Sequence, residues 1–328
     1  MYKLTVMNIS RGTFEDSIFQ DALLLELVLI SFAFIETGVL WYLLRHTNQY
    51  HRNLSMIMEQ MPNQYFVSLL ARMFMIYKQL TVFDTTALLA DRYFTFAVWL
   101  RNSLLFVALY FSPFPVFERC FATLFLNDYE IEKRRWISFS LSGALYLIAL
   151  TSAQSFVFGS SLNREIQITA ITAFNLLAFG LTFVLERYMR ARYSRLRKST
   201  SCGYTLRARA QLSENINSIV PFKAMCFSIA LFACLCTLLL RLDEYTESQS
   251  IKNWMYMAFN FSCWSYGTFV PFFVLAYNPL WQKELRRLAE KVKKPQKEDN
   301  RSVHFSSGVP FASRIGSLRI RTRMGKRN

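Results

Sequence analysis

The sequence predicts an all-α protein, a bundle of seven membrane-spanning helices with its N-terminus outside the cell and its C-terminus inside. Three observations predict this fold. Of the 328 residues, 53% are hydrophobic and only 18% are charged, against about 25% charged residues in ordinary soluble domains. Seven long apolar runs recur along the chain, and the net charge of +16 gathers in alternate connections between them. A composition so apolar excludes a disordered chain and argues against a soluble enzyme.

Each apolar run approaches the roughly 20 residues that a helix needs to cross a bilayer. The second run is the weakest, because it carries Glu59, Pro62 and Arg72, and the third contains two prolines. No cleavable signal peptide is evident before the first run. The expected spans cover residues 22–44, 53–77, 94–117, 137–159, 166–185, 222–240 and 254–277.

The distribution of Lys and Arg predicts the orientation. Of 38 basic residues, 28 lie in one alternating set of connections and 7 in the other. Basic connections face the cytoplasm, so residues 1–21 form an extracellular N-terminus. A nucleic-acid binder with a large core, the other class compatible with the composition, would not spread its charge in this way. The basic set comprises residues 45–52, 127–136, 187–223 and 281–328.

Cysteine and histidine usage argues against a disulfide, a metal centre or an enzyme. All six cysteines fall in the expected spans or the inner loop, so no extracellular disulfide is predicted. Cys234 and Cys236 have no companion ligands at a spacing typical of a metal site. With three histidines, ten glycines and no recognisable catalytic set, we expect no enzyme, no cofactor and no metal.

Ionisable residues inside the spans are candidate functional residues, because burying a charge in hydrocarbon costs several kcal/mol unless it is paired or hydrated. Arg101 lies roughly 10 Å below the outer end of the third span at helical rise. It could meet an anionic group of a ligand or a Glu, or it could extend to the outer headgroups. The residues of this kind are Glu26, Glu36, Glu59, Arg72 and Arg101.

The inner end of the third span carries Glu118 and Arg119, followed by Asp128 and Tyr129. An acidic–basic pair at a helix end can form a local ion pair that a partner or a helix shift breaks, which makes it a candidate two-state element. The alternative is an ordinary charge pair at the membrane interface.

Two basic segments predict contact with the inner leaflet. The first is the inner loop, whose cluster is typical of binding to anionic lipid and whose residues 204–216 can extend the sixth helix into the cytosol. The second is an amphipathic helix over residues 278–294, with Trp281, Leu285, Leu288 and Val292 on one face. The basic tail, residues 295–328, is expected to be disordered. The lipid contacts expected are Arg190, Arg192, Arg195, Arg197, Lys198, Trp281 and Leu285.

Several short sequence motifs along the chain resemble those of the nematode serpentine receptor class epsilon, a family of chemoreceptor-type G-protein-coupled receptors. The resemblance covers nearly the whole chain up to about Lys294, and the related classes alpha and beta share part of the inner-loop motif. The motifs are His51-Arg52-Asn53-Leu54, Glu118-Arg119, Asp128-Tyr129-Glu130, Tyr204-Thr205-Leu206, Arg209, Gln211, Glu214-Asn215 and Asn278-Pro279-Leu280.

This resemblance implies a chemosensory receptor that binds a small molecule from outside and signals to a heterotrimeric G protein. It places the receptor in the plasma membrane, including that of sensory neuron cilia. The expected partners are that ligand, the G protein, lipids and a further receptor copy, with no nucleic acid. We expect ligand contact near Trp99, Arg101 and Asn102. Alternatives are a seven-span ligand-gated cation channel of the chemoreceptor type and a small transporter. The residues implied in coupling are Glu118, Arg119, Asp128, Tyr129, Arg209, Asn278 and Pro279.

Overall fold

The computed structural model describes residues 14–47, 50–82, 85–125, 134–198 and 206–293. The expectations for Asp128, Tyr129, the first thirteen residues and the tail 295–328 therefore lie outside the described residues. The chain divides into two units at residue 287, and the bundle belongs to the first.

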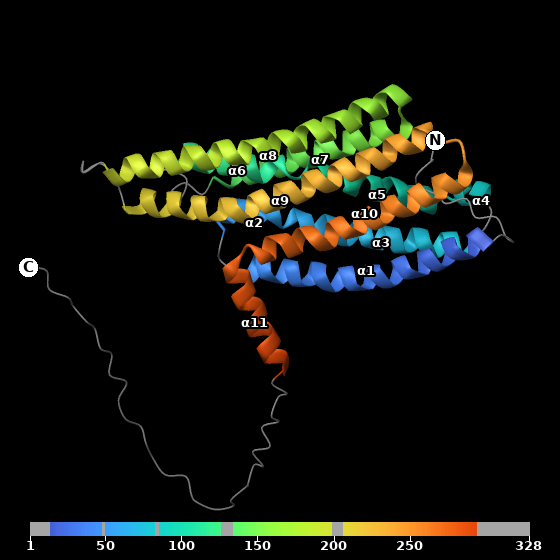
Figure 1. The fold of residues 1–328 in the computed structure, drawn as a ribbon, viewed down its shortest axis with the longest axis horizontal. Helices are drawn as coiled ribbons and strands as arrows, with labels where there is room; N and C mark the ends of the chain where they lie inside the picture. Colours follow the sequence, from blue (N-terminus) through green and yellow to red (C-terminus); the bar gives the residue numbers. More distant parts are fainter. Residues whose placement is uncertain (1–13, 48–49, 83–84, 126–133, 199–205, 294–328) are drawn as a thin grey trace, which may run out of the picture. The chain divides into compact units, whose positions relative to one another are not determined.

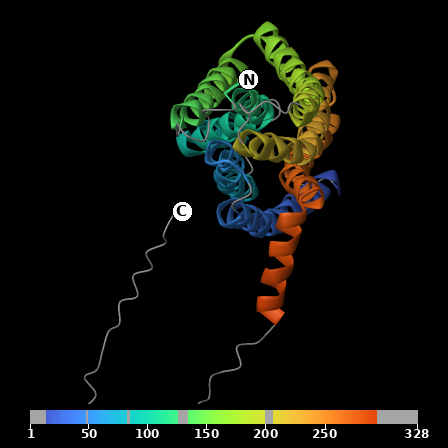
Figure 2. The same cartoon turned by 90° about the vertical axis from the view of Figure 1, so that its left-hand side faces the viewer.

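The described residues are helical, without a strand among them, and they build a bundle of seven membrane-spanning helices (Figure 1). Two of the seven are interrupted, so that α2 and α3 form the second and α5 and α6 form the third. Seen from the end, α5 and α6 lie among the other helices of the bundle (Figure 2), and they pack against α2, α3, α7, α8 and α9. The elements are α1 (Phe14–His46), α2 (Arg52–Met58), α3 (Gln60–Thr81), α4 (Thr85–Ala90), α5 (Arg92–Tyr110), α6 (Pro113–Leu124), α7 (Arg135–Phe158), α8 (Ser161–Lys198), α9 (Leu206–Tyr245), α10 (Gln249–Ala276) and α11 (Pro279–Lys293).

Several helices are longer than the apolar runs from which they were predicted. α1 begins at Phe14, inside the segment expected to be an extracellular N-terminus, and α8 runs on through the basic inner loop to Lys198. α9 begins at Leu206, as expected if the inner-loop segment extends the sixth helix. Hydropathy marks only the part of a helix that lies in hydrocarbon, so it cannot locate the ends that continue into water.

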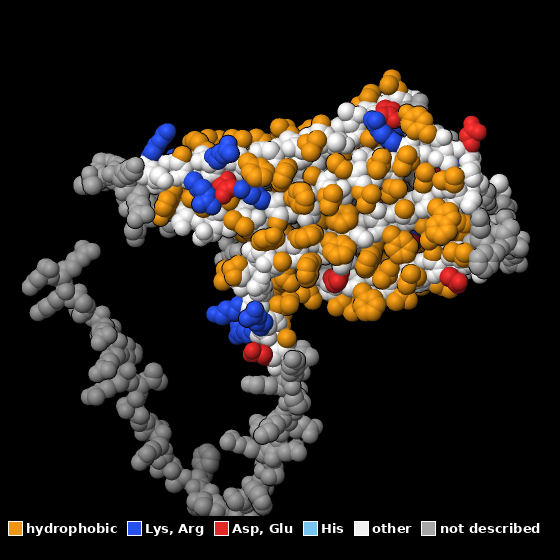
Figure 3. All heavy atoms as spheres, in the orientation of Figure 1, with side chains coloured by type: hydrophobic (Ala, Val, Ile, Leu, Met, Phe, Trp, Pro, Cys, Tyr) orange, Lys and Arg blue, Asp and Glu red, His pale blue; other side chains and the backbone are white. Residues whose placement is uncertain are grey.

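The flanks of the bundle are hydrophobic, as a membrane protein requires. Large apolar side chains such as Ile35, Leu147 and Leu177 are exposed there, whereas Lys and Arg gather near the end at which α8 finishes and α9 starts (Figure 3). In the described residues, five helices are long and apolar enough to cross a membrane: α1, α5, α7, α8 and α9. The other two, α3 and α10, carry more polar side chains, many of which are buried inside the bundle.

The third helix is broken because Pro113 has no backbone N–H and its ring cannot follow a continuous helix. α5 ends at Tyr110, and Pro113 starts α6. The carbonyl of Leu109, four residues before the proline, thereby loses its helical donor. The side chain of Asn175 on α8 replaces that donor, since its Nδ2 lies 2.8 Å from the Leu109 oxygen, and its Oδ1 accepts from the Ser112 hydroxyl at 2.8 Å. Asn175 therefore completes the break in the third helix.

Replacing Asn175 with Leu should lower the free energy of unfolding by about 1–3 kcal/mol, because it leaves the Leu109 carbonyl buried without a donor. The measurement is the thermal midpoint of the detergent-solubilised protein. Thr172→Val is the matched control, since the Thr172 hydroxyl bonds only within its own helix, to the carbonyl of Ile168. Equal midpoints for the two variants would show that Asn175 does not stabilise the break.

The start of α5 is tied to the end of α3. The Asp91 carboxylate accepts hydrogen bonds from the backbone amides of Tyr93 and Phe94, so it caps α5. Lys78 of α3 donates to the same carboxylate over 2.7 Å, and this hydrogen bond lowers the pKa of Asp91 below its ordinary value. The cap and the ion pair together fix the start of α5, the helix that carries Arg101, against the end of α3.

Candidate functional sites at the two ends of the bundle

A buried ion pair joins the first two membrane-spanning helices near the end of the bundle at which α1 begins. The Arg72 guanidinium of α3 holds the Glu26 carboxylate of α1 with two parallel hydrogen bonds, Nε to Oε1 at 2.6 Å and Nη2 to Oε2 at 2.5 Å. Glu26 is 4% exposed and Arg72 is 2% exposed. Such a bidentate geometry is the strong form of this interaction.

The pair continues into a wider polar network with α10. Arg72 also donates to the Tyr256 hydroxyl at 2.5 Å, and Tyr256 donates to Gln79 at 3.3 Å. One helical turn further along α10, Asn260 accepts from Arg101 of α5 at 2.5 Å. We call Glu26, Arg72, Arg101, Tyr256 and Asn260 the outer cluster; it brings together side chains from four of the seven spans.

The outer cluster holds one more positive charge than negative. The Glu26 carboxylate neutralises Arg72, and Arg101, which is 5% exposed, is the remaining cation. Among the described residues, no carboxylate lies within ion-pair distance of Arg101, which donates instead to the neutral amide of Asn260. A buried cation without a counter-ion is unfavourable, so the cluster suits an anionic group.

The structure does not bring the three expected ligand contacts together. Trp99 donates from Nε1 to Gln154 on α7 at 3.1 Å, whereas Arg101 reaches the opposite neighbour, α10. Asn102 is half-buried between these directions. Of the three, Arg101 alone belongs to the outer cluster.

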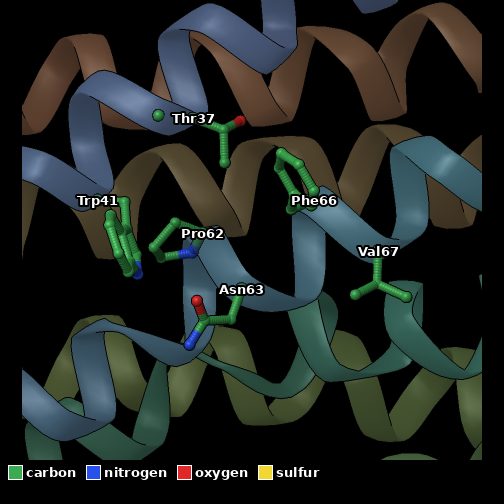
Figure 4. Close-up of a pocket in the computed structure, with 7 residues that line it drawn as sticks. Thr37, Trp41, Pro62, Asn63, Phe66 and Val67 are labelled. Atoms are coloured by element: carbon green, nitrogen blue, oxygen red, sulfur yellow. The ribbon is translucent and has the colours of Figure 1, made fainter.

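A separate groove of about 440 Å³ opens on the flank of the bundle, between α1 and α3 (Figure 4). Its lining is mostly apolar, and the Thr37 hydroxyl is already bonded to the Ala33 carbonyl of its own helix. None of the expected ligand contacts lines it. The lining residues are Thr37, Gly38, Trp41, Pro62, Asn63, Phe66 and Val67.

The opposite end of the bundle carries a second buried charge network. Arg119 of α6 holds the carboxylate of its neighbour Glu118 with Nε and Nη2, at 2.6 and 2.8 Å. Its Nη1 donates to the Asn215 side chain of α9 at 2.7 Å. Arg119 is 2% exposed and Glu118 is fully buried. The three residues form the inner cluster, which links the third membrane-spanning helix to the sixth.

The expected coupling residue Asn278 lies in a related network between α10 and α11. Its Nδ2 donates to the Tyr50 hydroxyl at 3.2 Å, and its Oδ1 accepts from the backbone amide of Trp281. Burial raises the pKa of the Tyr50 phenol, so this hydroxyl keeps its proton at physiological pH. Pro279 follows Asn278 as the first residue of α11, where its missing N–H costs nothing.

The predicted lipid contact of Trp281 is wrong. The side chain is fully buried, and its indole donates to the Thr47 hydroxyl at 2.9 Å. Leu285 is half-buried and packs against the same core cluster. The apolar face of the amphipathic pattern, at these two positions, therefore faces the protein rather than the bilayer.

The basic side chains of the inner loop have different surroundings. Arg190 is exposed and pairs with Glu186 on its own helix, whereas Arg192 donates to the Thr123 carbonyl at 2.7 Å near the end of α6. Arg195 is exposed. Arg197, Lys198 and Arg209 lie in helices, and their side chains are outside the described residues.

Sequence reasoning missed the partners rather than the charged residues. Tyr256 and Asn260 were not singled out, although they lie on one face of α10 at a spacing of four residues. Asn215 belongs to a motif of the resemblance but had no assigned role, and no sequence pattern pointed to Tyr50. The buried polar face of the seventh span was the one pattern that could have pointed to these contacts.

Comparisons with known proteins agree with one another. Residues 13–319 match the family described as Sre G protein-coupled chemoreceptor. Over 277 residues the chain is 28% identical to serpentine receptor class epsilon-8 of Caenorhabditis elegans, covering 83% of this chain and 80% of that receptor. Over 211 residues it is 30% identical to serpentine receptor class epsilon-13 of the same organism, covering 64% and 58% of the two chains.

Proposed function

Since the chain belongs to the Sre G protein-coupled chemoreceptor family, and is thus a chemosensory G-protein-coupled receptor, we propose that it detects a small anionic molecule at Arg101. The resemblance to serpentine receptor class epsilon is confirmed by the matching relatives. The channel and transporter alternatives are not favoured, because the family is one of receptors that signal through G proteins.

The observation that carries this proposal is the uncompensated charge of the outer cluster. Arg101 is buried and bonded to a neutral amide, while the neighbouring Arg72 is already satisfied by Glu26. A ligand carboxylate would supply the missing negative charge and a charge-assisted hydrogen bond. A neutral ligand of the same shape would supply neither.

Signalling would follow as a shift between two populations of the bundle. A ligand can favour one state only by binding it more tightly than the other. The outer cluster spans the first, second, third and seventh helices, so an anion at Arg101 would bind differently when these helices move. The inner cluster holds the third and sixth helices together through Arg119 and Asn215. Its opening would admit the G protein.

In the proposed orientation the receptor lies in the plasma membrane, with the outer cluster in the extracellular half of the bundle and the inner cluster at its cytoplasmic end. The asymmetry of Lys and Arg between connections supports it. In a sensory neuron the receptor would act in the cilia, with Arg190 and Arg195 near anionic lipid. An epitope tag before α1 should be stained by antibody on intact cells. Staining that requires permeabilised cells would overturn this orientation.

The ligand proposal is tested with short-chain carboxylic acids and their methyl esters, applied to cells that express the receptor with a panel of Gα subunits. Acids should activate the receptor and esters should not. Arg101→Gln should raise the half-maximal acid concentration about 10- to 100-fold, the equivalent of a lost charged hydrogen bond. Arg101→Lys should have a smaller effect.

Arg241→Gln is the matched control, because Arg241 is a half-exposed arginine paired with Glu165. Surface expression is measured for every variant. Acid responses that survive Arg101→Gln at equal surface expression would contradict the proposed contact, as would activation by the esters alone.

A further inference from the structure

Two cysteines on neighbouring helices face one small cavity. Cys236 of α9 and Cys263 of α10 both line it, together with Leu105 of α5 and the rings of Phe259 and Tyr266. Both are free thiols, Cys236 being 4% exposed and Cys263 half-buried. The sixth and seventh helices thus meet at a pair of adjacent thiols.

The electrostatic surroundings distinguish the two thiols. Cys263 follows Asn260 by three residues on α10, so it lies beside the amide that binds Arg101. A cation beside a cysteine stabilises the thiolate, which is the nucleophilic form. Cys263 is therefore the better nucleophile of the pair. Cys236 is placed to attack the oxidised sulfur that forms on Cys263.

The size of the cavity restricts what can reach the thiols. Its volume is about 20 Å³, which is room for one molecule the size of water. Glutathione or a bulky electrophile would not fit without a rearrangement of the rings around it. Hydrogen peroxide, a small uncharged oxidant with two oxygen atoms, would need the least rearrangement of these rings.

We propose that hydrogen peroxide oxidises Cys263 and Cys236 to a disulfide that ties the sixth helix to the seventh. The Cys263 thiolate attacks one peroxide oxygen, the O–O bond breaks, and the leaving hydroxide takes a proton to become water. This leaves a sulfenic acid on Cys263. The Cys236 sulfur then attacks that sulfur, the S–S bond forms, and the sulfenic hydroxyl leaves as water with the Cys236 proton. Two thiols are oxidised and one peroxide is reduced.

A disulfide here would restrain the sixth helix, whose contact with the third helix opens in the proposed signalling mechanism. The bond would join α9, which also carries Asn215 of the inner cluster, to α10. Oxidised receptor should then show a smaller G-protein response than reduced receptor, and dithiothreitol should restore it. This functional consequence rests on the proposed signalling mechanism, whereas formation of the disulfide does not.

The test treats the full-length receptor in nanodiscs with increasing hydrogen peroxide, then blocks free thiols with N-ethylmaleimide. Mass spectrometry of the unreduced digest should show a peptide cross-linked through Cys236 and Cys263, which dithiothreitol removes. Cys236→Ser should abolish that peptide and leave a sulfenic acid on Cys263, which dimedone traps after the receptor is denatured.

Cys226→Ser is the matched control, since Cys226 is a buried thiol on the same helix, and it should leave the cross-link unchanged. The proposal is overturned if peroxide oxidises the exposed Cys234 while Cys236 and Cys263 both stay free thiols, which N-ethylmaleimide then alkylates. If the cross-link forms without any change in G-protein response, the disulfide stands and its proposed consequence for signalling is wrong.

Discussion

Replacing Glu26 with Gln should lower the free energy of unfolding of the receptor by about 3–5 kcal/mol, because it leaves the Arg72 charge buried without its counter-ion. The two guanidinium–carboxylate bonds, at 2.6 and 2.5 Å, are among the most buried charged contacts of the bundle. The loss would add a second unneutralised cation next to Arg101. The measurement is the thermal midpoint of the receptor in nanodiscs.

Two controls separate pairing from packing. Glu165→Gln breaks the partly exposed pair with Arg241, and such surface pairs contribute at most about 1 kcal/mol. The double variant Glu26→Gln, Arg72→Met removes the unpaired charge, so it should recover most of the loss. If Glu26→Gln is no less stable than Glu165→Gln, the pair does not stabilise the fold.

Replacing Asn215 with Ala should raise ligand-independent nucleotide exchange on the G protein about tenfold or more. Arg119 binds Asn215 through one charged hydrogen bond of 2.7 Å, and such a bond contributes about 1.5–3 kcal/mol. Without it, the third and sixth helices lose a contact that holds them together, and the equilibrium shifts by a corresponding factor. Exchange is measured with purified heterotrimer and receptor membranes.

Asn217→Ala is the matched control, because Asn217 is exposed two residues further along α9. Asn215→Asp should act in the opposite direction, since a carboxylate would bind Arg119 more strongly than an amide does. Basal exchange that is equal in Asn215→Ala and Asn217→Ala would show that this contact does not hold the resting state.

The helices of the fold could be predicted from the sequence, while their interruptions and ends needed the structure. Apolar runs locate the hydrocarbon part of each span, and Pro113 marks a place where a helix can break. The sequence does not say which residue repairs that break, because Asn175 is 66 residues away from Leu109. The helical extension of α8 through the basic loop gives no hydropathy signal, because hydropathy marks only the part of a helix that lies in hydrocarbon.

The candidate sites likewise contain contacts that the sequence could predict and contacts that it could not. Glu118 and Arg119 are adjacent in sequence, so their ion pair could be foreseen from the dipeptide. The partners of Arg72 and Arg101 come from other helices, 46 and 159 residues distant, and no local pattern reports such pairings. Trp281 was misread because an amphipathic face is apolar whether it meets lipid or protein.

The most direct test of the signalling account compares Asn215→Ala with Asn215→Ala, Arg119→Ala at equal amounts of folded receptor in membranes. The single variant supplies ligand-independent exchange, so no ligand needs to be known. The resemblance implies that Arg119 takes part in coupling, so once released from Asn215 it should contact the G protein. Its removal should then bring the double variant down to the exchange rate of receptor-free membranes. Exchange in the double variant as fast as in the single variant would contradict the account.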